Sequence, residues 1–450
     1  MNSIIQYKKI GIGLLFGGVV FLVCLGIFNF VQASLLGIIV LLVVLWTNEG
    51  LPLAVVSLLP IILFPAFSIL TTKETAVNYS HPIIYLFLGG FLIAIAVEKS
   101  NLHTWIADKM LSLFPNTPRG MIFSLTITSG MLSSILSNTT TTLLLMSIAL
   151  FITEDIKLKL RFALAIAYGA SVGGILTPIG TPPNLILLGI MQDKAMEAIP
   201  FFQWMWMVAP LVFVMFIVVS LVLSFGVENT LIQRKDEKSI LDNDQKKVLW
   251  IIGGLIVLLL LNAPMKPFWG GLGLSEAGIL LSAGLLLFVH PFKVLEWMED
   301  KGKVPYRIMF LFGAGFSIAK AFSATGLAGE VASYLISMTD LSPVLLLLSV
   351  AMLITFTTEI TSNTALISIM LPVLYSVAQQ TGINATLFMM VATLCASYAF
   401  MLPIATPPNA IAMSSGAVDV KSMMRYGVIL NFIGIFLIVT IAQLFWTNIF

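Results

Sequence analysis

Two short polar stretches inside apolar sequence decide how this chain folds: Ser137–Thr139 (SNT) and Thr181–Asn184 (TPPN). The same pair occurs again as Ser362–Thr364 and Thr406–Asn409. Both members recur at one constant offset (137 to 362 and 181 to 406), so their spacing is the same in the two halves. A repeated pair at equal spacing indicates an internal duplication.

The duplication extends to the neighbours of both motifs. Further correspondences at the same offset are Ser133 with Thr358, Pro178 with Pro403, Ile179 with Ile404, and Gly180 with Ala405. Thr139 is matched by Thr364, whereas the run from 140 to 142 has no threonine counterparts and is interpreted as packing. The candidate functional residues are therefore those that recur at the same offset in both halves.

The composition around the motifs is that of a membrane protein. Of 450 residues, 59% are hydrophobic and only 10% are charged, and the mean hydropathy is +1.04. Such values exclude an ordinary water-soluble domain. The formal net charge of +2 gives no reason to expect a nucleic-acid partner. Cys24 and Cys395 both lie in apolar runs, so neither a disulfide framework nor a metal site is expected.

With roughly 20 apolar residues per membrane helix, the apolar stretches predict an all-α polytopic membrane protein. We expect about eleven transmembrane helices, near 10–30, 34–48, 51–69, 82–98, 160–190, 203–225, 247–263, 272–290, 304–323, 384–415 and 424–447. Two further apolar segments, 120–152 and 342–375, are interrupted halfway by small polar residues and are predicted to be re-entrant hairpins.

Basic residues suggest an orientation. With a cytoplasmic N-terminus, most basic clusters, including the charged segment 228–247, fall on the cytoplasmic side, as expected for a plasma (inner) membrane protein. The odd number of spans between the hairpins then makes the two repeats inverted. Secondary transporters with inverted repeats bind their substrates where discontinuous helices meet near the bilayer midplane.

The chain is therefore interpreted as one integral membrane transporter, 1–450. Its expected parts are scaffold helices (1–119), a first repeat with hairpin and broken helix (120–225), a cytoplasmic linker (226–247), scaffold and connecting helices (248–341) and a second repeat (342–450).

The motifs suit ion binding inside a membrane. Consecutive prolines remove backbone donors and interrupt a helix, and non-helical backbone at membrane depth is tolerated where it lines a cavity. Such a break offers carbonyl oxygens to a cation, and the helix that restarts after it offers N–H groups to an anion. The SNT side chains can donate to carboxylates while their oxygens coordinate sodium. Neither motif cluster contains Arg or Lys, so co-bound cations are expected to offset an anion.

Together, the paired SNT motifs, the paired Thr-Pro breaks and the span order resemble the divalent anion and sodium symporter family, across essentially the whole chain. The resemblance implies an elevator-type homodimer that imports C4-dicarboxylates (succinate, fumarate or malate) with sodium ions and needs no cofactor. It also implies which residues bind. The substrate set is Asn138, Thr139, Thr181, Ser362, Asn363, Thr364, Thr406 and Pro407. Sodium site 1 is Ser133, Ser137, Asn138 and Gly180, and sodium site 2 is Thr358, Thr361, Asn363 and Ala405.

The sequence is also compatible with functions other than sodium symport. A sodium-independent dicarboxylate or citrate exchanger of the same fold competes with symport, and a channel or a membrane enzyme are further classes. Gly169–Gly173 spells the nucleophile-elbow pattern of hydrolases, but we interpret it as a helix contact face and expect no catalytic residue. Glu359 has no carboxylate counterpart in the first repeat, and a supporting hydrogen-bond role is predicted for it. The pairs Gly89–Gly90 and Gly313–Gly315 are likewise predicted to serve close helix contacts.

Overall fold

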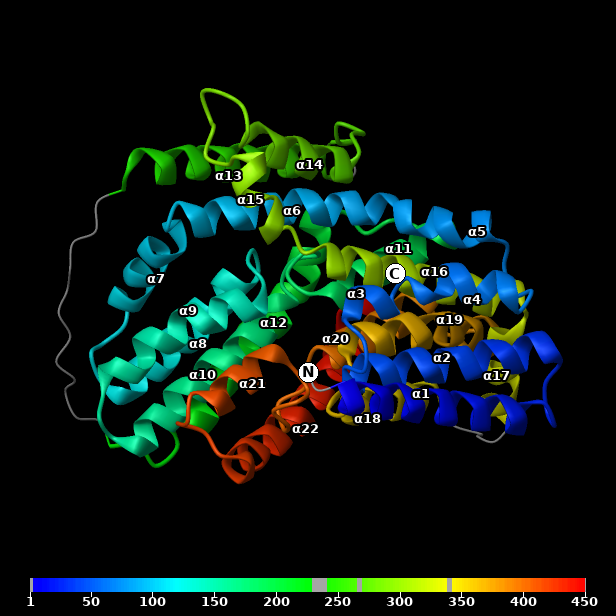
Figure 1. The fold of residues 1–450 in the computed structure, drawn as a ribbon. Coiled ribbons are helices and arrows are strands. Elements are labelled where there is room, and N and C mark those ends of the chain that lie inside the picture. Colours follow the sequence, from blue (N-terminus) through cyan, green and yellow to red (C-terminus); the bar gives the residue numbers. More distant parts are fainter. Residues whose placement is uncertain (1–2, 229–240, 265–268, 338–341, 450) are drawn as a thin grey trace.

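The computed structural model describes residues 3–228, 241–264, 269–337 and 342–449, and within these ranges the chain is built from helices without strands (Figure 1). Part of the predicted linker, 229–240, lies outside the described residues. Among the described residues, six helical stretches are long and apolar enough to cross a membrane: Ile5–Cys24, Phe30–Asn48, Thr72–Lys99, Phe201–Ser224, Tyr306–Ala324 and Val420–Leu444. The chain is a multi-pass membrane protein, as predicted.

Several helices outside the repeats pack on one long helix. α6 (Pro82–Lys99) follows α5 (Thr72–Ala76) and is covered by α14 (Glu276–Leu286), with α13 (Asn243–Asn262) beside it (Figure 1). A Cβ on Gly89 would overlap the backbone of Leu280, so glycine permits the approach of α14. Further helices outside the repeats include α1 (Ser3–Cys24), α2 (Phe30–Asn48), α7 (Leu102–Ser112), α15 (Trp297–Asp300), α16 (Tyr306–Ala324) and α17 (Leu327–Ser337).

The two repeats have the predicted hairpins and broken helices. The first contains the hairpin α8 (Pro118–Ser133) and α9 (Asn138–Ile152), the broken pair α10 (Ile156–Gly174) and α11 (Pro182–Asp193), and α12 (Phe201–Ser224). The second contains the hairpin α18 (Pro343–Thr358) and α19 (Asn363–Thr381), the broken pair α20 (Ala385–Ala396) and α21 (Pro407–Ser414), and α22 (Val420–Leu444).

Two expected spans differ from the structure. The segment 51–69 is divided into α3 (Leu53–Val56) and α4 (Leu59–Ala66), because Pro60 has no N–H for the carbonyl of Val56. The segment 272–290 is helical only from Glu276 to Leu286, because Gly271 and Gly273 have positive φ angles (79° and 69°) and the helix starts after Ser275. A hydropathy profile of the sequence shows neither the break before Pro60 nor the late start of α14.

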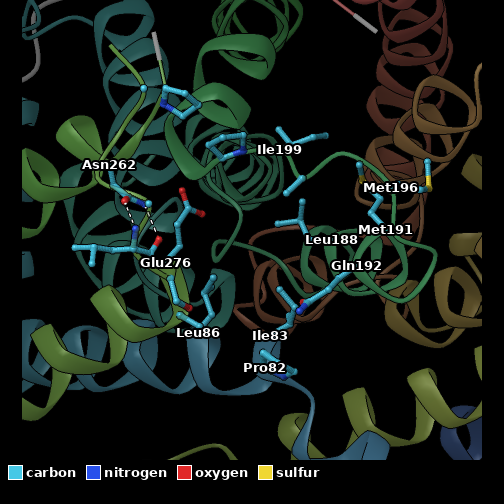
Figure 2. A pocket seen from close by; sticks show the side chains of 18 residues that line it. Pro82, Ile83, Leu86, Leu188, Met191, Gln192, Met196, Ile199, Asn262 and Glu276 are labelled. Atoms are coloured by element: carbon cyan, nitrogen blue, oxygen red, sulfur yellow. Dashed lines mark hydrogen bonds between the residues drawn. The ribbon is translucent and has the colours of Figure 1, made fainter. Parts of the chain in front are cut away.

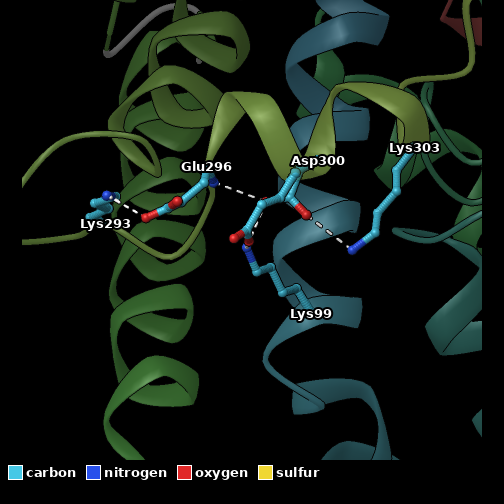
Figure 3. Close-up of polar contacts among 6 residues, drawn as sticks. Lys99, Lys293, Glu296, Asp300 and Lys303 are labelled. Carbon is cyan, nitrogen blue, oxygen red and sulfur yellow. Dashed lines mark hydrogen bonds and ion pairs between the residues drawn. The ribbon is translucent and has the colours of Figure 1, made fainter.

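A buried carboxylate ties α15 to α6 (Figure 3). Asp300 is only 3% exposed and accepts hydrogen bonds from Lys99 Nζ (2.7 Å), Lys303 Nζ (3.0 Å) and the backbone N–H of Glu296 (2.9 Å). Burial raises the pKa of Asp300, but these hydrogen bonds outweigh it and hold the pKa below its ordinary value.

Candidate functional site

Each hairpin tip is the start of a helix. Ser137 is the N-cap of α9, and its Oγ accepts a hydrogen bond from the N–H of Thr140 at 3.1 Å. Ser362 is the N-cap of α19 and accepts from the N–H of Ala365 at 3.5 Å. Serine favours this position because its oxygen satisfies an N–H of the first turn. Asn138 and Asn363 are consequently the first residues of their helices.

Each break also ends at a helix start. Residues 175–181 separate α10 from α11, and 397–406 separate α20 from α21. Pro182 and Pro407 are the first residues of the restarted helices, where proline is favoured because that N–H has no helical partner. The prolines therefore begin α11 and α21 and lie just after the non-helical backbone.

The repeats interlock at these helix starts. α21 of the second repeat packs against α9 and α10 of the first, and α11 of the first repeat packs against α19 and α20 of the second. The N-termini of α9, α11, α19 and α21 consequently border one cavity of about 400 Å³. Each N-terminus carries a partial positive charge, so the cavity favours an anion. Free N–H groups are available only in the first turns of α9 and α19 among these four helices, because α11 and α21 each begin with two prolines and the N–H groups of Asn184 and Asn409 are already hydrogen-bonded.

Eleven of the fourteen residues predicted to bind substrate or sodium line this cavity. They are Ser137, Asn138, Thr139, Gly180, Thr181, Ser362, Asn363, Thr364, Ala405, Thr406 and Pro407. The other three, Ser133, Thr358 and Thr361, do not line it. Ser133 and Thr358 lie fully buried behind the tip asparagines, and Thr361 Oγ1 bonds the carbonyl of Thr357 at 2.9 Å.

The buried hydroxyls make equivalent contacts in the two repeats. Ser133 Oγ donates to Asn138 Oδ1 at 2.5 Å, and Thr358 Oγ1 donates to Asn363 Oδ1 at 2.5 Å. Thr358 Oγ1 also lies 3.0 Å from the carbonyl of Ala396. Each repeat therefore clusters neutral oxygens directly beneath its tip. Among the described residues no group of three or more His, Cys, Asp or Glu side chains is placed to hold a metal ion.

The last residue of each TPPN motif holds its break in shape, a role that our sequence reasoning missed. Asn184 Nδ2 donates to the carbonyl of Thr177 at 2.9 Å, and Asn409 Nδ2 donates to that of Leu402 at 3.0 Å. Both side chains are fully buried. The shared offset was the signal that could have identified them, because Thr177 and Leu402 are separated by the same interval as the two motifs.

Glu359 has the supporting role that was predicted. Its carboxylate accepts hydrogen bonds from the N–H groups of Met401 (3.0 Å) and Leu402 (2.9 Å) and from Asn431 Nδ2 (2.6 Å). It thereby joins the second tip to the second break and to α22. Asn431 was not anticipated, because nothing in the sequence links 359 with 431.

Two charged residues also line the cavity and were not predicted. Arg307 is at the start of α16 and Glu49 is the C-cap of α2. Both come from outside the repeats. The expectation that the motif clusters contain no Arg or Lys is correct for the motifs, yet packing brings an arginine to the same cavity.

Other cavities are less suited to a small anion. One of them, of about 560 Å³, lies between α6, α11 and the start of α14 (Figure 2). Its walls are mostly apolar, and its carboxylate, Glu276, already accepts the N–H of Phe201 at 2.7 Å. Asn262 is likewise bonded to the backbone of Leu274 (2.9 and 3.0 Å). No predicted site residue lines this cavity.

The serine of the elbow-like pattern has a structural environment. Ser171 lies inside α10, is 1% exposed, and donates to the carbonyl of Ala167 at 3.2 Å. A Cβ on Gly169 or Gly173 would overlap the backbone of α8. The pattern is therefore a helix contact face, as predicted, because its glycines let α8 and α10 approach closely.

Comparison with known proteins agrees with this geometry. A family described as citrate transporters matches residues 41–393 of the chain. The chain belongs to this citrate transporter family. Its family places it among transporters rather than enzymes and confirms the resemblance to divalent anion transporters.

Relatives of this citrate transporter family member include the sodium-dependent dicarboxylate transporters SdcS of Staphylococcus saprophyticus (30% identical) and Staphylococcus aureus (31%). Each alignment covers 96% of this chain and 90% of the relative. The fold is similar to the YdaH transporter of Alcanivorax borkumensis (TM-score 0.61, 16% identical, covering 83% of this chain and 87% of that one). It is also similar to MtrF of Neisseria gonorrhoeae (TM-score 0.58, 12% identical, covering 83% of each chain).

Proposed function

We propose that this chain is a sodium-coupled secondary symporter that imports C4-dicarboxylates such as succinate, fumarate and malate. The observation that carries the proposal is the convergence of four helix N-termini and two SNT tips on one cavity. Relatives named as sodium-dependent dicarboxylate transporters support it. The cavity volume of about 400 Å³ is at the small end of the roughly 300–1,000 Å³ typical of ligand pockets.

In this proposal the substrate carboxylates bind between the tips. Asn138 and Thr139 donate on one side, and the triplet Ser362–Thr364 donates on the other. Thr181, Thr406 and Pro407 complete the pocket, and the helix N-termini stabilise the negative charge. All of these residues line the cavity.

Sodium ions are assigned to the oxygens beneath and beside each tip. Site 1 comprises Ser133, Ser137, Asn138 and the backbone of Gly180, and site 2 comprises Thr358, Thr361, Asn363 and the backbone of Ala405. Because each tip asparagine takes part in both a sodium site and the substrate site, sodium binding orders the groups that the anion needs. This sharing makes anion affinity depend on sodium.

Uptake into proteoliposomes tests the coupling. Purified protein is expected to accumulate labelled succinate when an inward sodium gradient is imposed, and not when sodium is replaced by choline. Uptake without sodium that instead requires an internal dicarboxylate would identify a sodium-independent exchanger. Competition by fumarate, malate, citrate and sulfate then ranks the substrates.

We further propose an elevator movement of the two repeats against the remaining helices. The cavity walls come from both groups, since Trp46, Phe87 and Leu311 lie on α2, α6 and α16. On another part of the seam, His81 Nε2 lies 3.3 Å from Asp193 Oδ1, and Lys194 Nζ donates to Ser323 Oγ at 2.7 Å. These contacts join the two groups and must separate if the groups slide.

Cross-linking tests the movement. The double variant His81→Cys/Asp193→Cys is expected to lose transport on oxidation and regain it on reduction, whereas each single variant stays active under both conditions. Full transport by the cross-linked protein would reject sliding at this seam.

Orientation and assembly complete the proposal. Glu49 and Arg307 line the cavity and belong to the side that the distribution of basic residues assigns to the cytoplasm. We therefore infer an inward-open cavity, a cytoplasmic N-terminus and a location in the plasma (inner) membrane. A homodimer is proposed on the family resemblance, and its mass in detergent tests that assembly.

A further inference from the structure

Arg307 and Glu49 are the charged residues among those that line the cavity; the rest of the described lining is neutral. Both side chains are exposed. Among the described residues neither makes an ion pair or a side-chain hydrogen bond. In the part of the chain that the structure describes, a cation and an anion therefore border this cavity without an ion-pair or side-chain hydrogen-bond partner.

Helix stability does not account for either residue. Arg307 lies in the first turn of α16, where the helix dipole disfavours a positive charge. Glu49 lies at the C-terminal end of α2, where the dipole disfavours a negative charge. Both charges have the unfavourable sign for their positions.

Glu49 is also in an unusual backbone conformation. Its φ and ψ are 52° and 41°, in the left-handed region that glycine and asparagine usually occupy. A non-glycine residue in this region is uncommon and is found preferentially at functional sites. The membrane-side preference of basic residues could explain Arg307 alone, but it does not explain an acidic residue facing the same cavity.

We propose that Arg307 and Glu49 form a charged rim that sorts the ions reaching the cavity, with Arg307 attracting the dicarboxylate and Glu49 attracting sodium. The inference rests on the proposed function and adds residues outside the duplicated motifs. Because α2 and α16 are not part of the repeats, the rim acts on ions that pass between the cavity and the aqueous phase. Arg307 is thus a positioning residue for the anion.

The expected size of the effect follows from screening. At separations near the Debye length of about 10 Å, a unit charge changes the affinity for a dianion by roughly threefold to tenfold at low ionic strength, and by much less in high salt. Opposite rim charges must act in opposite directions on the same ligand. This sign difference separates an electrostatic rim from a general disturbance of the fold.

Succinate binding to the purified full-length protein in detergent tests the rim, with sodium at the lowest concentration that saturates binding and the ionic strength then raised with choline chloride. Arg307→Gln is expected to raise the Kd for succinate about threefold to tenfold at low ionic strength, with a smaller change when choline chloride is added. Arg307→Lys is expected to restore most of the affinity. Glu49→Gln is expected to lower the Kd for succinate and to raise the half-saturating sodium concentration.

Arg425→Gln is the matched control. Arg425 is another exposed arginine near the start of a helix, α22, and it does not line the cavity. Its substitution removes the same charge and is expected to leave the Kd unchanged. Equal effects of Arg307→Gln and Arg425→Gln, or an Arg307→Gln effect that salt does not reduce, would overturn the rim while leaving sodium-dependent binding by the wild type intact. Absence of sodium-dependent succinate binding by the wild type would overturn the rim and the proposed function together.

Discussion

The two repeats build the same site but brace it differently. In the first repeat, Thr177 Oγ1 on the break donates to the carbonyl of Ser134 on the tip at 2.5 Å. In the second, the Glu359 side chain on the tip accepts N–H groups of the break at 2.9–3.2 Å. Ser134 and Glu359 are equivalent positions, so hydrogen bonds join tip and break in both repeats. In the first repeat the break contributes the side chain and the tip the backbone, and in the second repeat these roles are exchanged.

This difference separates two kinds of residue. Positions whose contacts are the same in both repeats include the proposed binding groups, such as Ser133 with Asn138 and Thr358 with Asn363. They also include Asn184 and Asn409, which hold the two breaks in shape. Positions whose chemistry differs hold those groups in place. Substitutions can therefore test the binding residues and the residues that hold them in place separately.

The largest effect is expected at the shared tip asparagines. Asn138→Ala and Asn363→Ala each remove a group that serves both a sodium site and the substrate site. Because hydrogen bonds to charged groups contribute about 1.5–3 kcal/mol, sodium-dependent succinate uptake at low concentration should fall by roughly 10- to 100-fold. An unchanged elution volume on gel filtration serves as the control for folding. Wild-type uptake by both variants would refute the site assignment.

The next largest effect is expected at Glu359, which joins the tip and the break of the second repeat. Glu359→Gln weakens three hydrogen bonds of a buried carboxylate, so thermal unfolding in detergent should show a loss of about 2–4 kcal/mol. The equivalent change in the first repeat, Ser134→Ala, should cost less than about 0.5 kcal/mol, since the backbone carbonyl makes that tie. Equal losses for the two variants would contradict this exchange of roles.

A smaller effect is expected where equivalent positions of the two repeats differ in side-chain size. A Cβ on Gly174 would lie 2.7 Å from Asn138 Oδ1, whereas the equivalent position in the second repeat is Ala399. Gly174→Ala should displace the first tip, and the half-saturating sodium concentration for uptake should rise by about threefold to tenfold, given overpacking costs of about 1–3 kcal/mol. Ala399→Gly is the matched control and should leave the sodium dependence near that of the wild type.

The smallest effect on transport is expected outside both repeats, at Asp300. Asp300→Asn removes its ion pairs with Lys99 and Lys303, so the protein should lose about 1–2 kcal/mol of stability at neutral pH without a change in sodium dependence. The pKa of Asp300 is lowered in the folded state, so its stabilisation is present above its unfolded pKa and is lost as pH falls through the folded value. The difference between wild type and variant should therefore shrink as pH falls below about 4 and disappear once pH is below the folded pKa. A difference that persists in acid would show that charge is not the cause.

The sequence alone determined the membrane class, the two hairpins, both helix breaks and the residues of the duplicated motifs. It could do so because apolar runs, proline positions and a fixed offset between the two halves are all local or repetitive properties of the chain. The break at Pro60 and the shortened α14 were missed, because hydropathy does not record lost backbone donors or positive φ angles.

Only the tertiary structure decided how the halves meet. The packing of α21 on α9 and of α11 on α19 brings the four helix N-termini together, and that contact depends on side-chain fit between segments that lie far apart in the sequence. The same packing brings Arg307 and Glu49 to the cavity from helices that carry no motif. Their positions follow from the shapes of surfaces that no spacing in the sequence encodes.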